Sequence, residues 1–263
     1  WARNSDTGRA MKVENMTYAQ WAGWKKGKTF ATFENTFGIS KKFAEGMQIT
    51  LESSVHGVVK DIYARYQNEI RCVNNKESRG AYFLASDGGI HFNEKDAQSG
   101  SKYQMPYQVA FHEFGHNIDW ILGGKNNLEY ASMKEYNGVK LIDVIKSDYK
   151  AFRKSLGIRN HKDFIEHMQS ENIPLIYCGN ISDVLEGITN ISYPLGIGHG
   201  KDYHKRNGAT AKEFFAEVLD SAAANQGSFN QMKRIFPNAV QMVFDIIEVG
   251  GQAVLGRQVL TTT

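Results

Sequence analysis

The sequence predicts an α+β fold in which a small sheet is followed by a mostly helical C-terminal half. Three observations support this prediction: a run of short β-like segments between residues 69 and 93, an Asp87-Gly88-Gly89 turn inside that run, and apolar residues at helical spacing over much of the remaining chain. Of the 263 residues, 41% are hydrophobic and 22% are charged, which is the composition of a folded globular protein.

The N-terminal part of the chain is expected to divide at about residue 28. Residues 1–28 hold three of the four tryptophans with little periodicity, so we expect a tail or linker with one short helix at Thr17–Trp24. Residues 29–263 are expected to form one domain. This domain opens with a helix over Ser40–Tyr66, in which apolar residues recur at steps of three and four and Ser40 is the N-cap.

The expected sheet comes next along the chain. Its strands are predicted at Glu69–Val73, Gly80–Ser86 and Ile90–Asn93. We expect the segment Ser86–Asn93 to form the edge strand along which an extended peptide can add by β-pairing. His91 in this segment is expected to be a surface or packing residue rather than a metal ligand.

Helices are predicted for most of the chain after this sheet. A strong helix is expected from Pro106 to about Leu122, closed by Gly123 and Gly124. The stretch at about 127–180 is interpreted as a helical insert with a loop at Gly157–Asn160, and a glycine-rich loop is expected at 192–209. The remaining helices are predicted at Ser182–Thr189, Thr210–Ala224 and Pro237–Val249.

Composition excludes several classes of partner and of metal site. Lys and Arg number 31 against 28 Asp and Glu, and this net charge of +3 does not indicate nucleic acid as a partner. No run of about 18 apolar residues occurs, so we expect no transmembrane helix and no membrane partner. Only Cys72 and Cys178 are present, both expected to be reduced structural thiols, so a metal site must use His and carboxylates.

The most informative segment is a predicted helix with the pattern HExxH. His112 and His116 stand at i and i+4, so both imidazoles project from one face and can bind a single zinc ion. Glu113 lies about 100° around the helix, where its carboxylate can reach a metal-bound water instead of the metal. Apolar neighbours would bury this helix, and buried polar groups need a partner such as a metal. The alternative is a pair of satisfied structural histidines.

Catalytic zinc takes three protein ligands and a water, so a third ligand is required. The extended pattern HExxHxxGxxH is excluded because positions 119 and 122 hold Asp and Leu. Glu213, in the segment KEFFAEVL, is the strongest candidate, and Glu217 lies one turn later on the same face, where it can orient a ligand. The other candidates for the third ligand are Glu186, Asp183, His199 and His204.

Two further groups are expected to support the site. Asp119 follows His116 by three residues, so we expect it to accept the second imidazole N–H and fix the tautomer of that histidine. Amide hydrolysis also needs a donor for the tetrahedral oxyanion, and the glycine-rich loop offers Tyr203 first and His204 second. The alternative for Tyr203 is an ordinary loop aromatic.

These motifs resemble those of a known family. HEFGHNIDW at 112–120 followed by EFFAEVL at 213–219 is similar to the zinc protease domain of anthrax lethal factor and its relatives, which are gluzincins. The resemblance implies a zincin-like fold, with His112, His116 and Glu213 as zinc ligands, Glu113 as the base and Glu217 contacting a ligand from outside. About a hundred residues separate His116 from Glu213, more than is usual in the family, and the insert at 127–180 accounts for this.

A closer resemblance is to metalloprotease-like regions at the C-terminus of phage head-morphogenesis (minor capsid) proteins. It is carried by HEFGHNID, ISDVLEG, GIGHGKDY and EFFAE, together with MTYAQW near the N-terminus, which is similar to the end of a capsid domain. It implies a zinc endopeptidase, phage-associated or toxin-like, that acts on a protein or peptide and meets other phage proteins through an upstream domain.

The resemblance leaves two compartments open, a phage virion and the host cytoplasm, and the N-terminal residues lack the layout of a signal peptide. The alternative function is a non-catalytic structural or interaction module of a phage particle on a zincin scaffold. A metal-independent hydrolase is excluded because no Ser or Cys sits in a recognisable nucleophile turn.

Overall fold

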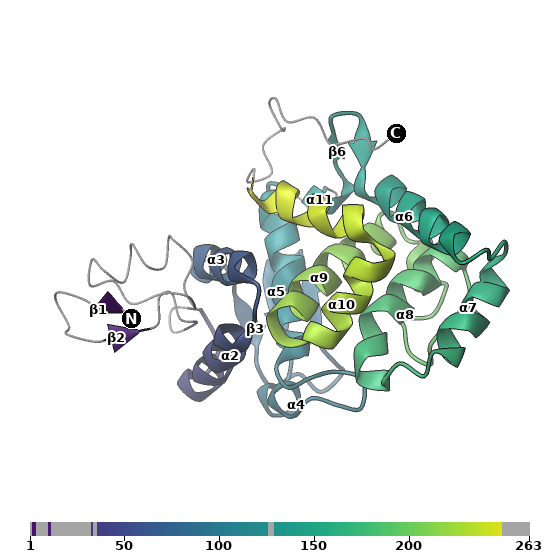
Figure 1. Ribbon diagram of the computed structural model, residues 1–263. Coiled ribbons are helices and arrows are strands. Elements are labelled where there is room, and N and C mark those ends of the chain that lie inside the picture. Colours follow the sequence, from purple (N-terminus) through teal and green to yellow (C-terminus); the bar gives the residue numbers. More distant parts are fainter. Residues whose placement is uncertain (1, 4–9, 12–32, 34–35, 126–128, 249–263) are drawn as a thin grey trace.

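The computed structural model describes residues 2–3, 10–11, 33, 36–125 and 129–248. Over these residues it confirms an α+β fold that is mostly helical and has a small sheet (Figure 1). The expected helix at Thr17–Trp24 lies outside the described residues.

The strands are β1 (Ala2–Arg3), β2 (Ala10–Met11), β3 (Cys72–Asn74), β4 (Tyr82–Leu84), β5 (Gly89–His91), β6 (Glu135–Tyr136) and β7 (Val139–Lys140). The α-helices are α2 (Lys41–Ser53), α3 (Gly57–Tyr66), α4 (Glu94–Ser99), α5 (Gln108–Leu122), α6 (Leu141–Ser155), α7 (His161–Ser170), α8 (Leu175–Thr189), α9 (Ala209–Ala224), α10 (Gln226–Ile235) and α11 (Pro237–Glu248). Two short 3-10 helices are η3 (Ala131–Met133) and η4 (Tyr203–Lys205).

The single helix predicted over Ser40–Tyr66 is two helices, α2 and α3. The break falls at Ser54, whose backbone is extended and whose hydroxyl donates to the carbonyl of Ala222 on α9 at 2.6 Å. Val55 lies in this break and is 74% exposed. Its apolar side chain continues the helical spacing in the sequence although it does not pack in the core, so the spacing did not reveal the break. The N-cap prediction is confirmed, because the backbone N–H of Phe43 donates to the hydroxyl of Ser40 at 3.2 Å.

The three-stranded sheet has the order β3-β5-β4, with β5 in the centre. β4 and β5 form the predicted antiparallel hairpin, in which Phe83 lies opposite Ile90, and Gly88 adopts a φ of 66° in the turn. β3 pairs with the other side of β5 in parallel. The prediction that Ser86–Asn93 is the edge strand is therefore wrong, because the parallel β3 covers the side of β5 that the hairpin leaves open. The outer strands of this sheet are β3 and β4, and an isolated bridge joins Phe37 to Arg71 beside β3.

The stretch predicted as a helical insert at about 127–180 contains more than helices. η3 and the hairpin β6–β7 precede α6 and α7, and the expected loop near Gly157–Asn160 separates those two helices. The hairpin turn is Asn137-Gly138, and both residues have positive φ, as a two-residue turn of this type requires. This dipeptide is the signal by which the hairpin could have been predicted.

In the C-terminal half, one predicted helix is too short and one observed helix was not predicted. α8 begins at Leu175, so the prediction of Ser182–Thr189 is too short. α10 was not predicted, although its buried Phe229, Met232 and Ile235 recur at steps of three and its N-cap Asn225 accepts from the backbone of Ser228. The helices predicted at Thr210–Ala224 and from Pro237 correspond to α9 and α11.

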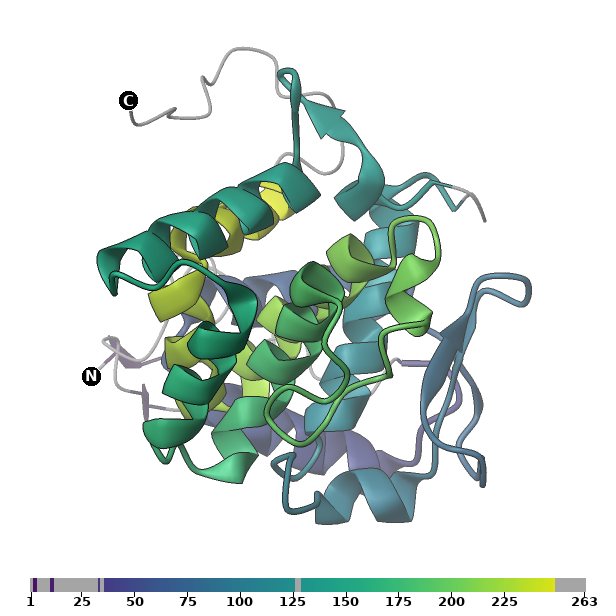
Figure 2. The same cartoon turned by 90° about the vertical axis from the view of Figure 1, so that its right-hand side faces the viewer.

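The centre of the molecule is the pair α5 and α9, which lie side by side in both views (Figures 1 and 2). Gly115 makes this contact close, since a Cβ added there would lie 2.9 Å from the Cα of Ala216. The small sheet packs on α5, where the ring of Phe83 meets that of Trp120 at 5.6 Å. Within the described ranges, no helix has the length and apolar character that crossing a bilayer demands.

Candidate metal centre

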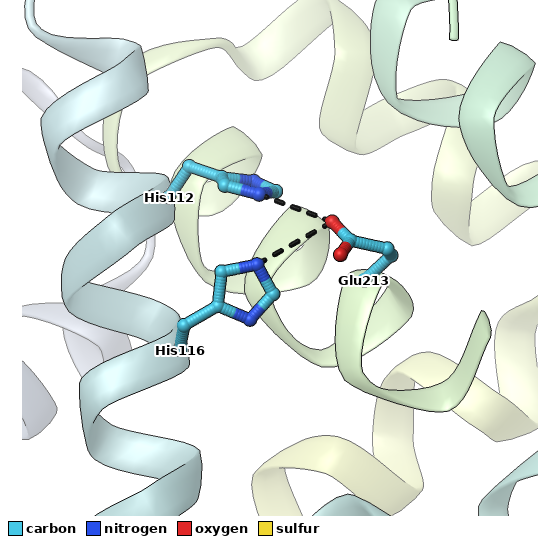
Figure 3. A group of neighbouring side chains, drawn as sticks. All are labelled: His112, His116 and Glu213. Atoms are coloured by element: carbon cyan, nitrogen blue, oxygen red, sulfur yellow. Dashed lines mark ion pairs between the residues drawn. The ribbon is translucent and has the colours of Figure 1, made fainter. Parts of the chain in front are cut away.

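α5 and α9 bring the two motif histidines and Glu213 to one point. The predicted helix with the HExxH pattern is confirmed as α5, and Figure 3 shows both imidazoles turned toward the Glu213 carboxylate on α9. The Nε2 atoms of His112 and His116 lie 3.3 and 3.4 Å from Oε2 of Glu213. The His112 and Glu213 side chains are buried, and His116 is nearly so. The sequence segments that meet here are almost a hundred residues apart.

These three ligand atoms fit a metal ion. Two ligands about 2.0 to 2.1 Å from a tetrahedral zinc lie about 3.3 Å apart, which matches both observed separations. Oε2 of Glu213 is buried and receives no hydrogen bond from the described part of the chain. A buried carboxylate oxygen without a hydrogen-bond partner needs a cation nearby, because an unpaired buried charge is strongly unfavourable. The group can therefore hold a metal ion.

The electrostatics of the cluster agree with this picture. Burial raises the pKa of Glu213, but the facing His116 and His112 outweigh it, so the net pKa lies well below its ordinary value. Burial lowers the pKa of His112, and here Glu217 and Asp220 outweigh it, so that pKa lies well above its ordinary value. The pocket thus attracts positive charge, as a cation site must.

Asp220 orients His112, and the sequence reasoning missed it. Its Oδ2 lies 2.9 Å from Nδ1 of His112, so Nδ1 carries the hydrogen and Nε2 keeps its lone pair for a metal. Asp220 follows Glu213 by seven residues and Glu217 by three, and this spacing on one helix face is the signal that could have found it.

A buried polar network holds the Asp220 carboxylate. Its Oδ1 accepts from the amide groups of Gln108 at 3.0 Å and Asn180 at 2.7 Å. The oxygen of the Asn180 side chain in turn accepts from the hydroxyl of Ser228 at 2.6 Å. These groups come from α5, α8 and α10, so three helices contribute to orienting one histidine.

Glu217 lies close to His112 but is not the carboxylate nearest to that ring. Its Oε2 is 3.8 Å from Nδ1 of His112, farther than Asp220, and accepts a hydrogen bond from the Asn180 amide. Burial and the neighbouring Asp220 raise the pKa of Glu217 well above its ordinary value. Asp220, and not Glu217, is therefore the carboxylate nearest to Nδ1 of His112.

Glu113 lines a cavity that opens beside His112. Its Oε2 is buried and has no hydrogen-bond partner among the described residues. Burial raises the pKa of Glu113, against the opposing effect of His112 and His116. An acceptor of this kind, desolvated and unengaged, is free to take a proton from a small molecule in the cavity.

Asp119 has a different partner from the one predicted. Its two carboxylate oxygens accept from the backbone N–H of Ser132 at 2.7 Å and from the Ser132 hydroxyl at 2.6 Å. The prediction that Asp119 accepts from His116 is therefore wrong, because η3 occupies both oxygens by packing against α5 and α9. Burial raises the pKa of Asp119 to about 6, although the Ser132 hydrogen bonds oppose the shift.

Tyr203, the first candidate for the oxyanion donor, has its hydroxyl engaged. The hydroxyl donates to Oε1 of Glu213, the carboxylate oxygen that the two histidines do not face. Burial, and after it the Glu213 charge, raises the pKa of Tyr203, so the phenol remains a donor. Its ring stacks on that of His199, with centroids 4.4 Å apart.

The four other candidates for the third ligand gather around Asp183, which has a ligand atom within 4.8 Å of Glu213 and Glu217 as well. Asp183 accepts from the backbone N–H and from Nδ1 of His199, at 3.1 and 2.7 Å. His204 Nε2 lies 3.5 Å from the same oxygen of Asp183, and Glu186 accepts from the backbone of Gly200 and Tyr193. In the described part of the chain, Glu213 is the residue that groups with the His112–His116 pair.

A cavity of about 230 Å³ opens beside this centre. His112, Glu113, Asp183, His199 and Glu217 line its polar side. Ala81, which precedes the edge strand β4, also lines it and takes part in an adjoining hollow of about 210 Å³. The two hollows share the lining residues Ala81, Gln104 and Val109.

His91 and the two cysteines are expected to have structural roles, and their contacts agree with this. His91 bonds to Asp87 at 2.8 Å and stacks on Tyr82, as a packing residue. Cys72 and Cys178 are buried free thiols, and burial raises the pKa of both.

Comparison with known proteins adds no family assignment. No protein-family model matches the chain, and no curated protein and no solved structure matches it either. What the chain does is accordingly inferred from the side chains of the metal centre and the cavity.

Proposed function

We propose that this chain is a zinc-dependent endopeptidase whose substrate is a protein or peptide. The observation that carries the proposal is the convergence of His112, His116 and Glu213 at tetrahedral ligand separations beside a cavity that the unpartnered Glu113 carboxylate faces. Zinc fits this donor set, since two imidazoles, one carboxylate and an open position are typical of catalytic zinc. Zinc supplies Lewis-acid chemistry when bound: it polarises a scissile carbonyl and lowers the pKa of a water molecule.

The residues of the chain have separate tasks in this proposal. Glu113 takes the proton of the attacking water and delivers it to the leaving amine, and the burial that raises its pKa suits both transfers. Asp220 holds His112 in the tautomer that presents Nε2. Tyr203 holds Oε1 of Glu213, which leaves Oε2 to face the histidines.

A zincin-like arrangement is part of the proposal. Three features support it: the helix that carries HExxH, the small sheet packed on that helix, and the open edge β4 that begins at the cavity. An extended peptide paired with β4 would pass from the second hollow to Glu113. The resemblance to minor capsid proteins of phages extends the proposal to a phage-associated protease.

The experiment measures bound zinc and peptide cleavage on the same preparations. Glu113→Gln should keep one zinc per chain and lose cleavage of a peptide library, because the amide cannot take the proton. Glu213→Gln should lose both zinc and cleavage. Glu166→Gln, on the exposed side of α7, is the matched control and should change neither.

Two results would contradict the proposal in different ways. A wild-type protein that takes up no zinc would remove the metal centre. A protein that holds zinc and yet cleaves no member of the library would favour the alternative, a structural or interaction module built on the same scaffold.

A further inference from the structure

His199 is a residue of the cavity wall to which no role has been assigned so far. It lines the cavity together with His112 and Glu113, and it comes from the glycine-rich loop between α8 and α9. The proposed chemistry leaves one task without a residue, because the Tyr203 hydroxyl already donates to Glu213 and Tyr203 does not line the cavity. That task is donation to the oxyanion that forms when water attacks an amide.

The His199 ring is held in one orientation from two sides. Oδ1 of the buried Asp183 accepts from both the backbone N–H of His199 and its Nδ1, at 3.1 and 2.7 Å. Tyr203 stacks on the ring at 4.4 Å with an interplanar angle of 20°. Because Asp183 engages Nδ1, the second ring nitrogen, Nε2, is the atom that can serve a ligand in the cavity.

The loop itself is fixed by a second buried carboxylate. Glu186 is fully buried and accepts from the backbone N–H groups of Gly200 at 2.8 Å and Tyr193 at 2.9 Å. Gly198 has a φ of 152°, and a Cβ added there would lie 2.3 Å from Oε2 of Glu186. Only glycine permits this approach, and the result is a donor that is positioned before any substrate arrives.

We propose that His199 is a further catalytic residue, which donates a hydrogen bond from Nε2 to the oxyanion of the tetrahedral intermediate, with Asp183 as its positioning residue. This inference rests on the proposed function. The pairing with Asp183 supports it: burial lowers the pKa of His199, but Asp183 outweighs burial and raises it to about 8, which favours the protonated ring and with it an N–H donor at Nε2. A protonated donor forms the stronger hydrogen bond to an anion.

A second metal ion held by Asp183, His199 and His204 is the competing interpretation of the same cluster. The distance between Oδ1 of Asp183 and Nδ1 of His199 is 2.7 Å, which is the length of a hydrogen bond. Two ligands of one tetrahedral zinc would lie about 3.3 Å apart. The same oxygen also accepts the backbone N–H of His199. This favours the interpretation in which Asp183 orients His199 as a hydrogen-bond donor.

The test uses the full chain loaded with cobalt in place of zinc, whose visible absorption reports ligands that reach the metal. Inorganic phosphate is the probe that resembles a tetrahedral oxyanion. Ethanethiol is the comparison probe, because it binds the metal but has no oxyanion. In His199→Ala, phosphate affinity should fall by about 10- to 100-fold while ethanethiol affinity changes by less than about threefold. His199→Gln keeps an N–H donor and much of the side-chain volume, so its phosphate affinity should fall less than that of His199→Ala.

His91→Ala is the matched control, because His91 also pairs with an aspartate, at 2.8 Å, but lies away from the cavity. It should bind both probes like the wild type. On any peptide that the wild type cleaves, His199→Ala should lower kcat by about 100- to 1000-fold with little change in KM.

Phosphate affinity that is unchanged in both His199 variants would overturn the inference and leave the metal centre intact. Two metal ions per chain in the wild type and one in His199→Ala would also overturn it, in favour of a second metal site. Failure of the wild type to bind any metal would instead remove the proposed function, and the role of His199 with it.

Discussion

His112 on α5 and Asp220 on α9 form a hydrogen bond of 2.9 Å between Nδ1 and Oδ2. α9 therefore supplies both Glu213, a ligand candidate, and the group that orients another ligand candidate. Because Gln108 and Asn180 donate to the second oxygen of Asp220, the carboxylate cannot turn away from His112 without breaking a buried network. The strength of metal binding should depend on this pair.

Replacing Asp220 should weaken zinc binding without removing a ligand. Asp220→Asn should lower zinc affinity by about 10- to 100-fold, because the amide no longer provides a charged acceptor for Nδ1–H. Competition with a chromophoric chelator measures this affinity. Glu217→Gln is the control, since Glu217 lies farther from His112 and the amide mimics its protonated form, so the affinity should change by less than about threefold. Equal losses in both variants would contradict the assignment.

Zinc should stabilise the fold as well as the site. A ligand at a hundred times its Kd that binds only the native state adds about 2.7 kcal/mol to the free energy of unfolding. Thermal melts with zinc and with a chelator measure the difference. His116→Ala should remove the response, because it takes away one of the three ligand atoms that His112, His116 and Glu213 bring together. A zinc-dependent Tm shift that survives in His116→Ala would place the metal elsewhere.

The contact of Gly115 with Ala216 should be sensitive to a single methyl group. Gly115→Ala should destabilise the fold by about 1 to 3 kcal/mol, although alanine is the better helix former, because α5 and α9 would have to move apart. Urea unfolding measures the change. Gly179→Ala on α8 is a milder control, since its added Cβ meets one backbone oxygen, that of Tyr103, at 3.1 Å. A stabilised Gly115→Ala would show that the helices are not in close contact.

The pairing of Asp183 with His199 should make stability depend on pH in the metal-free protein. The folded pKa of His199, about 8, lies above the ordinary value of 6.5. A raised histidine pKa means that the folded state holds the proton more tightly. The stabilisation is therefore fully present below pH 6.5 and is lost as pH rises through about 8.

NMR titration of the His199 ring measures its pKa. Urea unfolding at pH 6 and pH 9 measures the change in the free energy of unfolding. Asp183→Asn should return the His199 pKa toward its ordinary value and flatten the pH dependence of stability over this range. A His199 pKa that does not fall in Asp183→Asn would show that another group raises it.

Local patterns carried much of the prediction. The HExxH spacing, the apolar faces and the closing glycines predict the helix that is observed as α5, and the i, i+4 pair Glu213 and Glu217 predicts a ligand face on α9. The Asp-Gly-Gly turn predicts the β4–β5 hairpin. These features depend on residues a few positions apart, and for such residues backbone geometry sets which side chains share a face.

The sequence by itself thus determined most of the helices, the β4–β5 hairpin and the residues able to bind a metal. Only the tertiary structure decided the partners, which are Ser132 for Asp119, Asp220 for His112 and Asp183 for His199, and the central place of β5 in the sheet. The physical reason is that a hydrogen bond reaches about 3 Å, so its partner depends on how elements far apart in the chain cross one another. Spacing within α9 shows that Asp220 shares a face with Glu213, but it does not show which residue of another helix Asp220 meets.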